Sequence, residues 1–166
     1  DDGIFLIPGR PTGGCNVFVV KGQHKTILID VGLPDDYHYL CSSLTQIGLC
    51  IDEIDMVLIT HEHIDHVGCL PQLPKRIVVA AHERAANKFA LGDQFTTMGG
   101  DFVRGAVSPH IDVHLADGAV IDLGGLQLRV IYSPGHCSGA VCFYEARRGI
   151  LFTGDTVYAG GILGGI

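Results

Sequence analysis

The sequence has no tryptophan, only two methionines, 17% charged residues and no apolar run of the length that spans a bilayer. No charged segment followed by an apolar one opens the chain, so no secretory signal is visible, although a chain that begins at Asp1 leaves room for a removed leader. Basic residues number 11 against 18 acidic ones, and the formal net charge is −7. This balance argues against a broad surface for nucleic acid or anionic membrane. We therefore expect neither as a partner.

The six cysteines form no CxxC pair and no dense framework of the kind that stabilises small secreted domains. Free thiols in a reducing compartment are the simpler interpretation, and disulfides are the alternative. The free thiols predict a cytoplasmic location.

Length and hydrophobic content indicate one domain with a layered α/β fold. The 166 residues are 47% hydrophobic, which is enough to bury a sizeable core. Short apolar strands come first and then alternate with helices, the order typical of α/β proteins. Strands are expected at 16–20, 26–30, 56–60, 76–81, 119–123, 126–132, 140–146 and 149–155, and helices at 36–48 and 82–92.

The segment 92–110 has weak periodicity and several glycines, so we expect a surface loop or lid there. Its apolar residues, Phe95, Met98 and Phe102, could face a substrate. The alternative is that they pack the loop onto the domain.

The stretch HEHIDH, residues 61–66, follows a short apolar strand and concentrates side chains of the kinds that bind metals. His61 and His63 are two positions apart, so in an extended chain their rings project to the same side and can share one ion. Asp65 and His66 follow where the chain turns into a short helix, so they point elsewhere and could hold a second ion. Imidazole and carboxylate without a neighbouring thiolate favour a catalytic zinc site. The alternative is a solvated polar turn.

Two further candidates lie far along the chain. His136 follows a Pro-Gly turn after the strand expected at 126–132, and Asp155 ends the strand expected at 149–155. Ligands gather at strand ends of this kind in layered α/β folds. Both residues are therefore candidates to close a site that begins at HEHIDH.

HEHIDH, SPGHCSG, LFTGD and the earlier LIDVG resemble the successive motifs of the metallo-β-lactamase superfamily, in their usual order across essentially the whole chain. The resemblance implies an αββα sandwich of two mixed β-sheets with outer helices and a metal pair in the cleft along one edge. It also implies roles for seven residues. His61, His63 and His136 would bind the first metal, Asp65 and His66 the second, and Asp155 both, while Asp30 would support the ligand loop or, alternatively, cap a turn.

One part of the family pattern is missing. The family closes the second metal site with a histidine well beyond the bridging aspartate, whereas this sequence ends at Ile166 on AGGILGGI. A natural domain seldom ends in this way, because its second half would lack elements that cover the sheet. We therefore expect residues 1–166 to be a single but incomplete domain, in which the second metal is held weakly, by water or by another chain.

The chemistry expected of such a site is hydrolysis. A metal-bound water loses a proton near neutral pH and attacks a polarised carbonyl or phosphoryl centre, while Asp65 orients the nucleophile and shuttles a proton. Asp155 stands where true β-lactamases of the superfamily carry Cys or Ser, and the acidic balance disfavours the RNA-processing members. The resemblance therefore favours a hydrolase with one or two zinc ions and a small-molecule thioester, lactone or related ester as substrate.

Several alternatives stay open. Tyr158 stands three residues after Asp155, as in quorum-quenching lactonases, where such a hydroxyl can donate to a developing oxyanion; packing against the lid is its other interpretation. Iron or manganese could replace zinc, and a mononuclear iron dioxygenase resembling the persulfide-oxidising relatives of glyoxalase II uses a similar first-site set. A β-lactamase-like or phosphodiester hydrolase, a scaffold without activity and a homo-oligomer are further alternatives.

Other polar residues near the motifs have no predicted ligand role. Glu62 lies between two of the histidines and should point away from them, as a surface or a supporting residue. The remaining histidines are expected to be structural or solvated: His24, His38, His82, His110 and His114.

Overall fold

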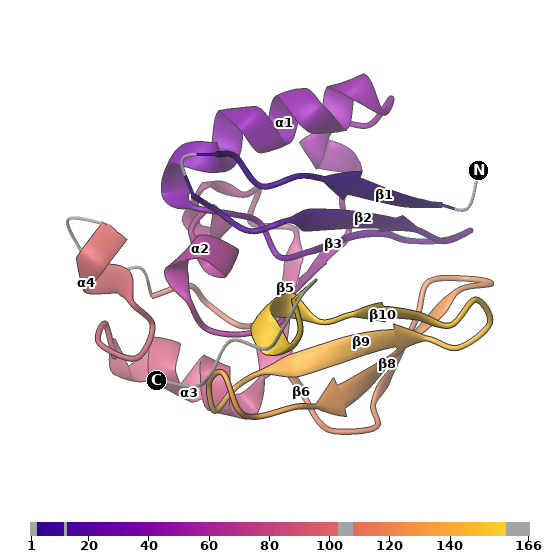
Figure 1. Cartoon of the computed structure of the whole chain (residues 1–166). Coiled ribbons are helices and arrows are strands. Elements are labelled where there is room, and N and C mark those ends of the chain that lie inside the picture. Colours follow the sequence, from indigo (N-terminus) through magenta and orange to yellow (C-terminus); the bar gives the residue numbers. More distant parts are fainter. Residues whose placement is uncertain (1–2, 12, 103–107, 159–166) are drawn as a thin grey trace.

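The computed structural model describes residues 3–11, 13–102 and 108–158. Two β-sheets pack face to face, and helices lie on the outer side of the first sheet (Figure 1). The predicted sandwich architecture is confirmed. Two stretches discussed above lie outside the described part of the chain. They are residues 103–107, within the expected loop or lid, and residues 159–166, the AGGILGGI end.

The first sheet has six strands in the order β1-β2-β3-β4-β5-β6, with antiparallel pairing up to β3 and parallel pairing beyond it. Its first and last strands were not predicted, because both are short and lie at sheet edges. The strands are β1 (Ile4–Ile7), β2 (Val17–Lys21), β3 (Thr26–Ile29), β4 (Met56–Leu58), β5 (Val78–His82) and β6 (Val113–Leu115).

The second sheet has four strands in the order β10-β9-β8-β7. Every pairing among them is antiparallel, whereas two mixed sheets were predicted. The reason lies in the connections, since short turns such as the one at Gly124 and Gly125 can join only antiparallel neighbours. The strands are β7 (Val120–Asp122), β8 (Gln127–Tyr132), β9 (Val141–Glu145) and β10 (Ile150–Phe152).

Both predicted helices form, as α1 (Tyr37–Gln46) and α3 (Glu83–Leu91). Helix α3 ends where Gly92 adopts a left-handed conformation with φ 64°, which is the expected glycine stop. A short helix α2 (Ile64–Val67) begins within HEHIDH, as predicted. The segment predicted as a loop contains one more short helix, α4 (Gly99–Phe102), whose four residues gave too little periodicity to be seen.

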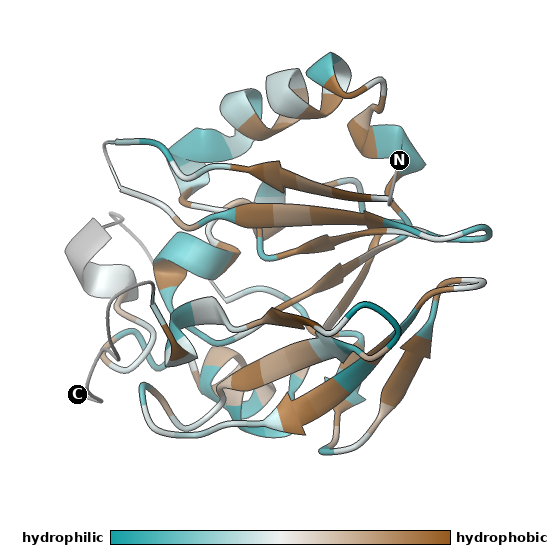
Figure 2. Ribbon diagram, turned by 45° about the vertical axis from the view of Figure 1, so that its right-hand side comes forward, coloured by the Kyte–Doolittle hydropathy of each residue, from teal (hydrophilic) through white to brown (hydrophobic). Residues whose placement is uncertain are grey.

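Two apolar layers hold these elements together. Leu28 and Val57 of the first sheet belong to the layer that includes Leu40 and Leu44 of α1. On the opposite face Ile29 packs with residues of the second sheet such as Phe143. Figure 2 shows hydrophobic residues concentrated along the strands and hydrophilic ones on the outward surfaces of the helices. Burial on both faces explains why the central strands read as continuous apolar runs rather than alternating ones.

The arrangement brings the motif residues to one edge. Parallel strands β3 and β4 end side by side, so Asp30 follows one and Thr60 follows the other at the same edge. The loop between β8 and β9 and the turn after β10 reach the same edge from the second sheet. Among the described residues, no helix has the length and apolar character that a bilayer crossing requires. All six cysteines are described, and none forms a disulfide, as expected.

Candidate metal centre

His61, His63 and His136 form a compact group, called here the three-histidine cluster. His61 and His63 lie between β4 and α2, and His136 comes from the loop between β8 and β9. The Nδ1 atom of His63 lies 3.2 Å from Nε2 of His61 and 2.9 Å from Nε2 of His136. The exposed fractions of His61 and His63 are 1% and 6%. Three ring nitrogens from distant segments thus converge on one buried point.

Two rings of this cluster, those of His61 and His63, are held in the neutral form. Burial lowers the pKa of His61 well below its ordinary value, and the neighbouring His66, His63 and His136 lower it further. Burial also lowers the pKa of His63, with His136 as the next cause. A neutral imidazole has a lone pair available for a cation. The cluster therefore has the chemical state that a metal ligand needs.

Thr60 fixes the orientation of His61, a role that the sequence prediction missed. Its hydroxyl donates to Oδ2 of Asp30 at 2.7 Å, because an ionised carboxylate only accepts. The hydroxyl oxygen then accepts from Nδ1 of His61 at 3.1 Å. This leaves Nε2 of His61 without a proton and directed toward the other two rings. The signal available in the sequence was a polar residue between a buried strand and the first histidine.

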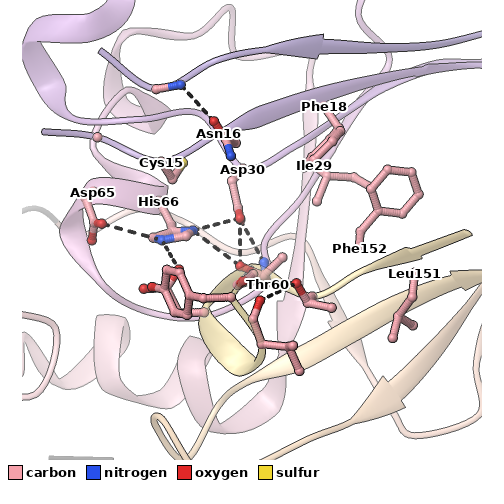
Figure 3. Close-up of a pocket in the computed structure, with 17 residues that line it drawn as sticks. Cys15, Asn16, Phe18, Ile29, Asp30, Thr60, Asp65, His66, Leu151 and Phe152 are labelled. Carbon is pink, nitrogen blue, oxygen red and sulfur yellow. Dashed lines mark hydrogen bonds and ion pairs between the residues drawn. The ribbon is translucent and has the colours of Figure 1, made fainter. Parts of the chain in front are cut away.

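Asp30, Asp65, His66 and Asp155 form a second group, called here the His66 cluster. Nδ1 of the buried His66 lies 2.8 Å from Oδ2 of Asp30, and its Nε2 lies 3.2 Å from Oδ1 of Asp155 and 3.5 Å from Oδ2 of Asp65. Burial opposes a charge on His66, but the carboxylates of Asp30 and Asp155 outweigh burial and raise its pKa well above the ordinary value. Figure 3 shows Asp30 and Asp65 on either side of this ring.

Asp155 joins the two clusters. One carboxylate oxygen lies 3.2 Å from Nε2 of His66, and the other lies 3.6 Å from Nε2 of His136. Burial tends to raise its pKa, but the hydrogen bond and charge of His66 outweigh burial and lower it to about 2. The carboxylate is therefore ionised at neutral pH and stands between imidazoles of both groups.

Tyr158 lies beside this carboxylate. Burial raises the pKa of its hydroxyl, and a hydrogen bond to Asp155 raises it further. The side chain is 38% exposed and lines a cavity of about 410 Å³ together with Asp65 and His66 (Figure 3). Its catalytic role stays a prediction, because the hydroxyl is at present directed to Asp155.

Glu62 corrects one expectation. It was predicted as a surface or a supporting residue, and it is fully buried, so the surface alternative is wrong. Its carboxylate pairs with Lys88 of α3 and accepts from the Cys137 thiol at 3.2 Å and from the Gly139 amide at 3.3 Å. Alternation along the extended chain sends Glu62 away from the histidines, but α3 and the His136 loop cover that side. No sequence signal identified Lys88 as its partner.

Gly139 lies where the His136 loop comes very close to Glu62 and helix α3. A Cβ atom at this position would collide with the Glu62 carboxylate and would lie 2.8 Å from both Cβ and the backbone nitrogen of Ala85 at the start of α3. Only glycine therefore allows the His136 loop to lie against Glu62 and α3.

Cys15 lies beside the His66 cluster, a contact that the sequence analysis did not anticipate. Ligand atoms of Cys15, Asp30 and His66 all lie within 4.8 Å of one another. Burial raises the pKa of this thiol, which keeps its sulfur protonated. The contact could not be predicted from the sequence, because Cys15 precedes β2 and is far from HEHIDH along the chain.

The residues present fit a metal ion. The three-histidine cluster offers three imidazole nitrogens, which is the protein ligand count of a catalytic zinc site. Nδ1 of His136 is buried and has no hydrogen-bond partner in the described part of the chain. The His66 cluster offers one imidazole with carboxylates, a donor set that suits a second divalent cation. The predicted residues thus come together, and their roles as ligands stay predictions.

Comparison with known proteins places this geometry in a family. The family described as Metallo-beta-lactamase superfamily matches residues 10–164. The chain belongs to the metallo-β-lactamase superfamily. Members that resemble it include the acyl-coenzyme A thioesterase MBLAC2 of Bos taurus, which is 35% identical over 98% of this chain and 66% of its own length. The hydroxyacylglutathione hydrolase of Ectopseudomonas mendocina is 34% identical over 63% of this chain and 34% of its own.

Solved structures of the superfamily share the fold. The crystal structure of a metallo-beta-lactamase family protein from Thermus thermophilus matches with a TM-score of 0.79 and 24% identity, over 96% of this chain and 61% of that one. At this identity the likeness concerns the fold alone. The chain spans about two thirds of the length of the thioesterase that it matches, 66%.

Proposed function

We propose that this protein is a metal-dependent hydrolase of thioesters. The observation that carries the proposal is the position of Asp155, whose two oxygens reach the three-histidine cluster and the His66 cluster. Two similar proteins are named for the hydrolysis of an acyl-coenzyme A and a hydroxyacylglutathione, and both of these substrates are thioesters. Six free cysteines agree with a cytoplasmic location, which we propose as well.

The proposed ligands divide between the two clusters. His61, His63 and His136 would hold one zinc ion, and Asp65, His66 and Asp155 would hold a second. When bound, such ions supply a nucleophile at neutral pH and polarise the substrate carbonyl. Thr60 and Asp30 contact Nδ1 of His61 and of His66, so that Nε2 of each ring faces the centre. His66 would lose its Nε2 proton when an ion binds.

Asp65 is the proposed proton carrier. Its side chain is 33% exposed, so it can reach both the centre and a substrate in the cavity. In the reaction water adds its oxygen to the acyl carbon, the carbon–sulfur bond breaks, and one proton of the water passes to the departing thiolate. A carboxylate at this place can take that proton and return it to sulfur. The products are a carboxylic acid and a thiol.

The test is a comparison of substrate classes with the purified protein. We expect hydrolysis of acetyl- and octanoyl-coenzyme A, measured as released thiol, to exceed hydrolysis of a homoserine lactone, a cephalosporin and a phosphodiester. Metal content measured on the same preparation should be mostly zinc. A protein that carries zinc and hydrolyses none of the thioesters would refute the proposal.

A second candidate is an iron dioxygenase. It is favoured by the group formed by His61, His66 and Asp155, whose ligand atoms lie within 4.8 Å of one another. Two imidazoles and one carboxylate are the set that non-heme iron oxygenases use. Protein purified without added metal that contains mostly iron, at one ion per chain, would support this candidate against the hydrolase.

A further inference from the structure

A second cavity reaches the three-histidine cluster, and its lining shares neither Asp65 nor Tyr158 with the first. Its volume is about 480 Å³, and His63 and His136 form its inner end. The segment before and within α4 forms its outer wall through Phe95, Met98 and Gly100. Its lining is mainly apolar, unlike that of the cavity beside the His66 cluster.

Among the described residues of this lining, the one lysine or arginine is already paired. Lys88 contributes to the wall, but its ammonium group makes an ion pair with the buried Glu62. The methylene groups of the lysine therefore face the cavity while its charge is compensated behind it. An anionic ligand gains little from such a wall, whereas an alkyl chain meets apolar surface.

Phe95 adds an independent observation. Its side chain is 91% exposed, although an aromatic ring of this size normally finds partners. It lines the apolar cavity together with Met98. A ring left open to solvent at the rim of a cavity that leads to a candidate metal centre is suited to contact a ligand.

We propose that this cavity binds the acyl chain of the thioester and that Phe95, Met98 and Gly100 set the preferred chain length. The inference rests on the proposed thioester hydrolysis. The carbonyl would lie at the centre, the acyl chain would run past His63 and His136 toward Phe95, and the thiol part would leave on the other side. Each methylene buried is worth about fourfold in binding, so the preference for longer chains ends where the cavity ends.

Gly100 provides a way to fill the cavity without removing a side chain. In the described part of the chain, no heavy atom other than those of the neighbouring residues and of the helix backbone lies within 4 Å of a Cβ at this position, and its φ is not in the left-handed region. Gly100→Phe should therefore fold and occupy cavity space, while Gly100→Ala makes the same backbone change and leaves the space open. Phe95→Ala removes the exposed aromatic ring from the cavity wall. Its matched control is Leu91→Ala, because the Leu91 side chain is 84% exposed and lies outside the lining.

The experiment measures kcat/KM for acetyl-, butyryl- and octanoyl-coenzyme A in these four variants and the wild type. In Gly100→Phe we expect a loss of about tenfold or more for octanoyl-coenzyme A and less than about twofold for acetyl-coenzyme A. Phe95→Ala should lower the octanoyl value by about threefold to tenfold. Leu91→Ala should follow the wild type for all three substrates, whereas Gly100→Ala, which adds one methyl group to the lining, should lower the octanoyl value far less than Gly100→Phe does.

A binding measurement separates this inference from the proposed function. The non-hydrolysable thioether analogue of octanoyl-coenzyme A is titrated into the zinc-loaded protein, and Kd is compared for wild type and Gly100→Phe. Weaker binding in the variant supports the cavity even if no thioester is hydrolysed, in which case only the proposed function fails. Equal Kd values, or equal losses of kcat/KM for acetyl and octanoyl substrates, would overturn the inference.

Discussion

The three-histidine cluster and the His66 cluster lie side by side but balance charge in opposite ways. In the first, imidazoles face one another, and burial keeps the pKa of His61 and His63 low. In the second, carboxylates surround one imidazole, and the pKa of His66 is raised. The first cluster therefore needs a cation to satisfy its lone pairs, whereas the second is partly satisfied by its own charges.

This difference shows how much each cluster depends on support from its surroundings. In the first cluster, Thr60 holds His61, and contacts with Glu62 hold the His136 loop. In the second, carboxylates hold both ring nitrogens of His66, Asp30 at Nδ1 and Asp155 at Nε2. The two clusters should therefore respond to different substitutions.

The largest effect is expected where the clusters meet. Asp155→Ala removes the carboxylate that reaches both, so activity should fall to background and the metal content of both sites should fall. His61→Ala should also abolish activity, with the metal loss centred on the three-histidine cluster. Activity assays and metal analysis by mass spectrometry check both variants. His24→Ala, in the turn between β2 and β3, should change neither quantity, and full activity in Asp155→Ala would refute its bridging role.

The next effect separates the three-histidine cluster from its support. Glu62→Gln leaves Lys88 without its anion, so the free energy of unfolding should fall by about 2–4 kcal/mol, as measured by urea titration. Adding Lys88→Met removes the unpaired cation and should recover part of that loss. If the Glu62 carboxylate positions the His136 loop, zinc affinity stays reduced in the double variant. Wild-type affinity there would show that only the charge balance matters.

A smaller effect is expected at the His66 cluster. Asp30→Asn replaces the carboxylate that holds Nδ1 of His66, and metal affinity should fall about 10-fold to 100-fold. Asparagine tolerates the φ of 60° that Asp30 adopts, so the backbone should be preserved. Competition with a chelator measures the change. Unchanged affinity for a second ion would argue that Asp30 only caps the turn.

The smallest expected effect is on stability and concerns Glu145, a residue outside both clusters. It serves as a reference because metal content should not change. Burial tends to raise the pKa of Glu145, but hydrogen bonds from Arg148 and from the backbone of Arg147 outweigh it and lower the pKa. Its stabilisation is therefore present above the ordinary glutamate pKa and is lost as the pH falls through the lowered value. Glu145→Gln should cost about 1–2 kcal/mol at neutral pH and flatten the acid limb of the stability profile, with metal content unchanged. A steeper acid limb would contradict this.

Much of the fold could be predicted because burial on both faces gives the central strands apolar runs that are easy to detect. The helices α1 and α3 were found through their spacing and glycine stops. Strands β1 and β6, at the two edges of the first sheet, were missed. Helix α4 was missed as well, because four residues carry little helical periodicity.

The candidate centre was predicted as a set of residues but not as a set of contacts. The motif residues come together because the ends of β3 and β4 and two loops of the second sheet share one edge. The partners Thr60, Lys88 and Cys15 could not be assigned, because their contacts depend on how the loops pack. Glu62 was placed on the correct side of the chain, but only the fold determines that this side is covered.

The close contact at Gly139 has a consequence for motion. Because the His136 loop lies directly against the start of α3, the loop has no room to swing inward and can open only away from the helix, breaking the Glu62 hydrogen bonds as it does so. Local opening of the loop therefore requires these hydrogen bonds to break. Metal release should accordingly be slow, with a rate that follows hydrogen exchange of the Gly139 amide rather than the faster motions of the surface.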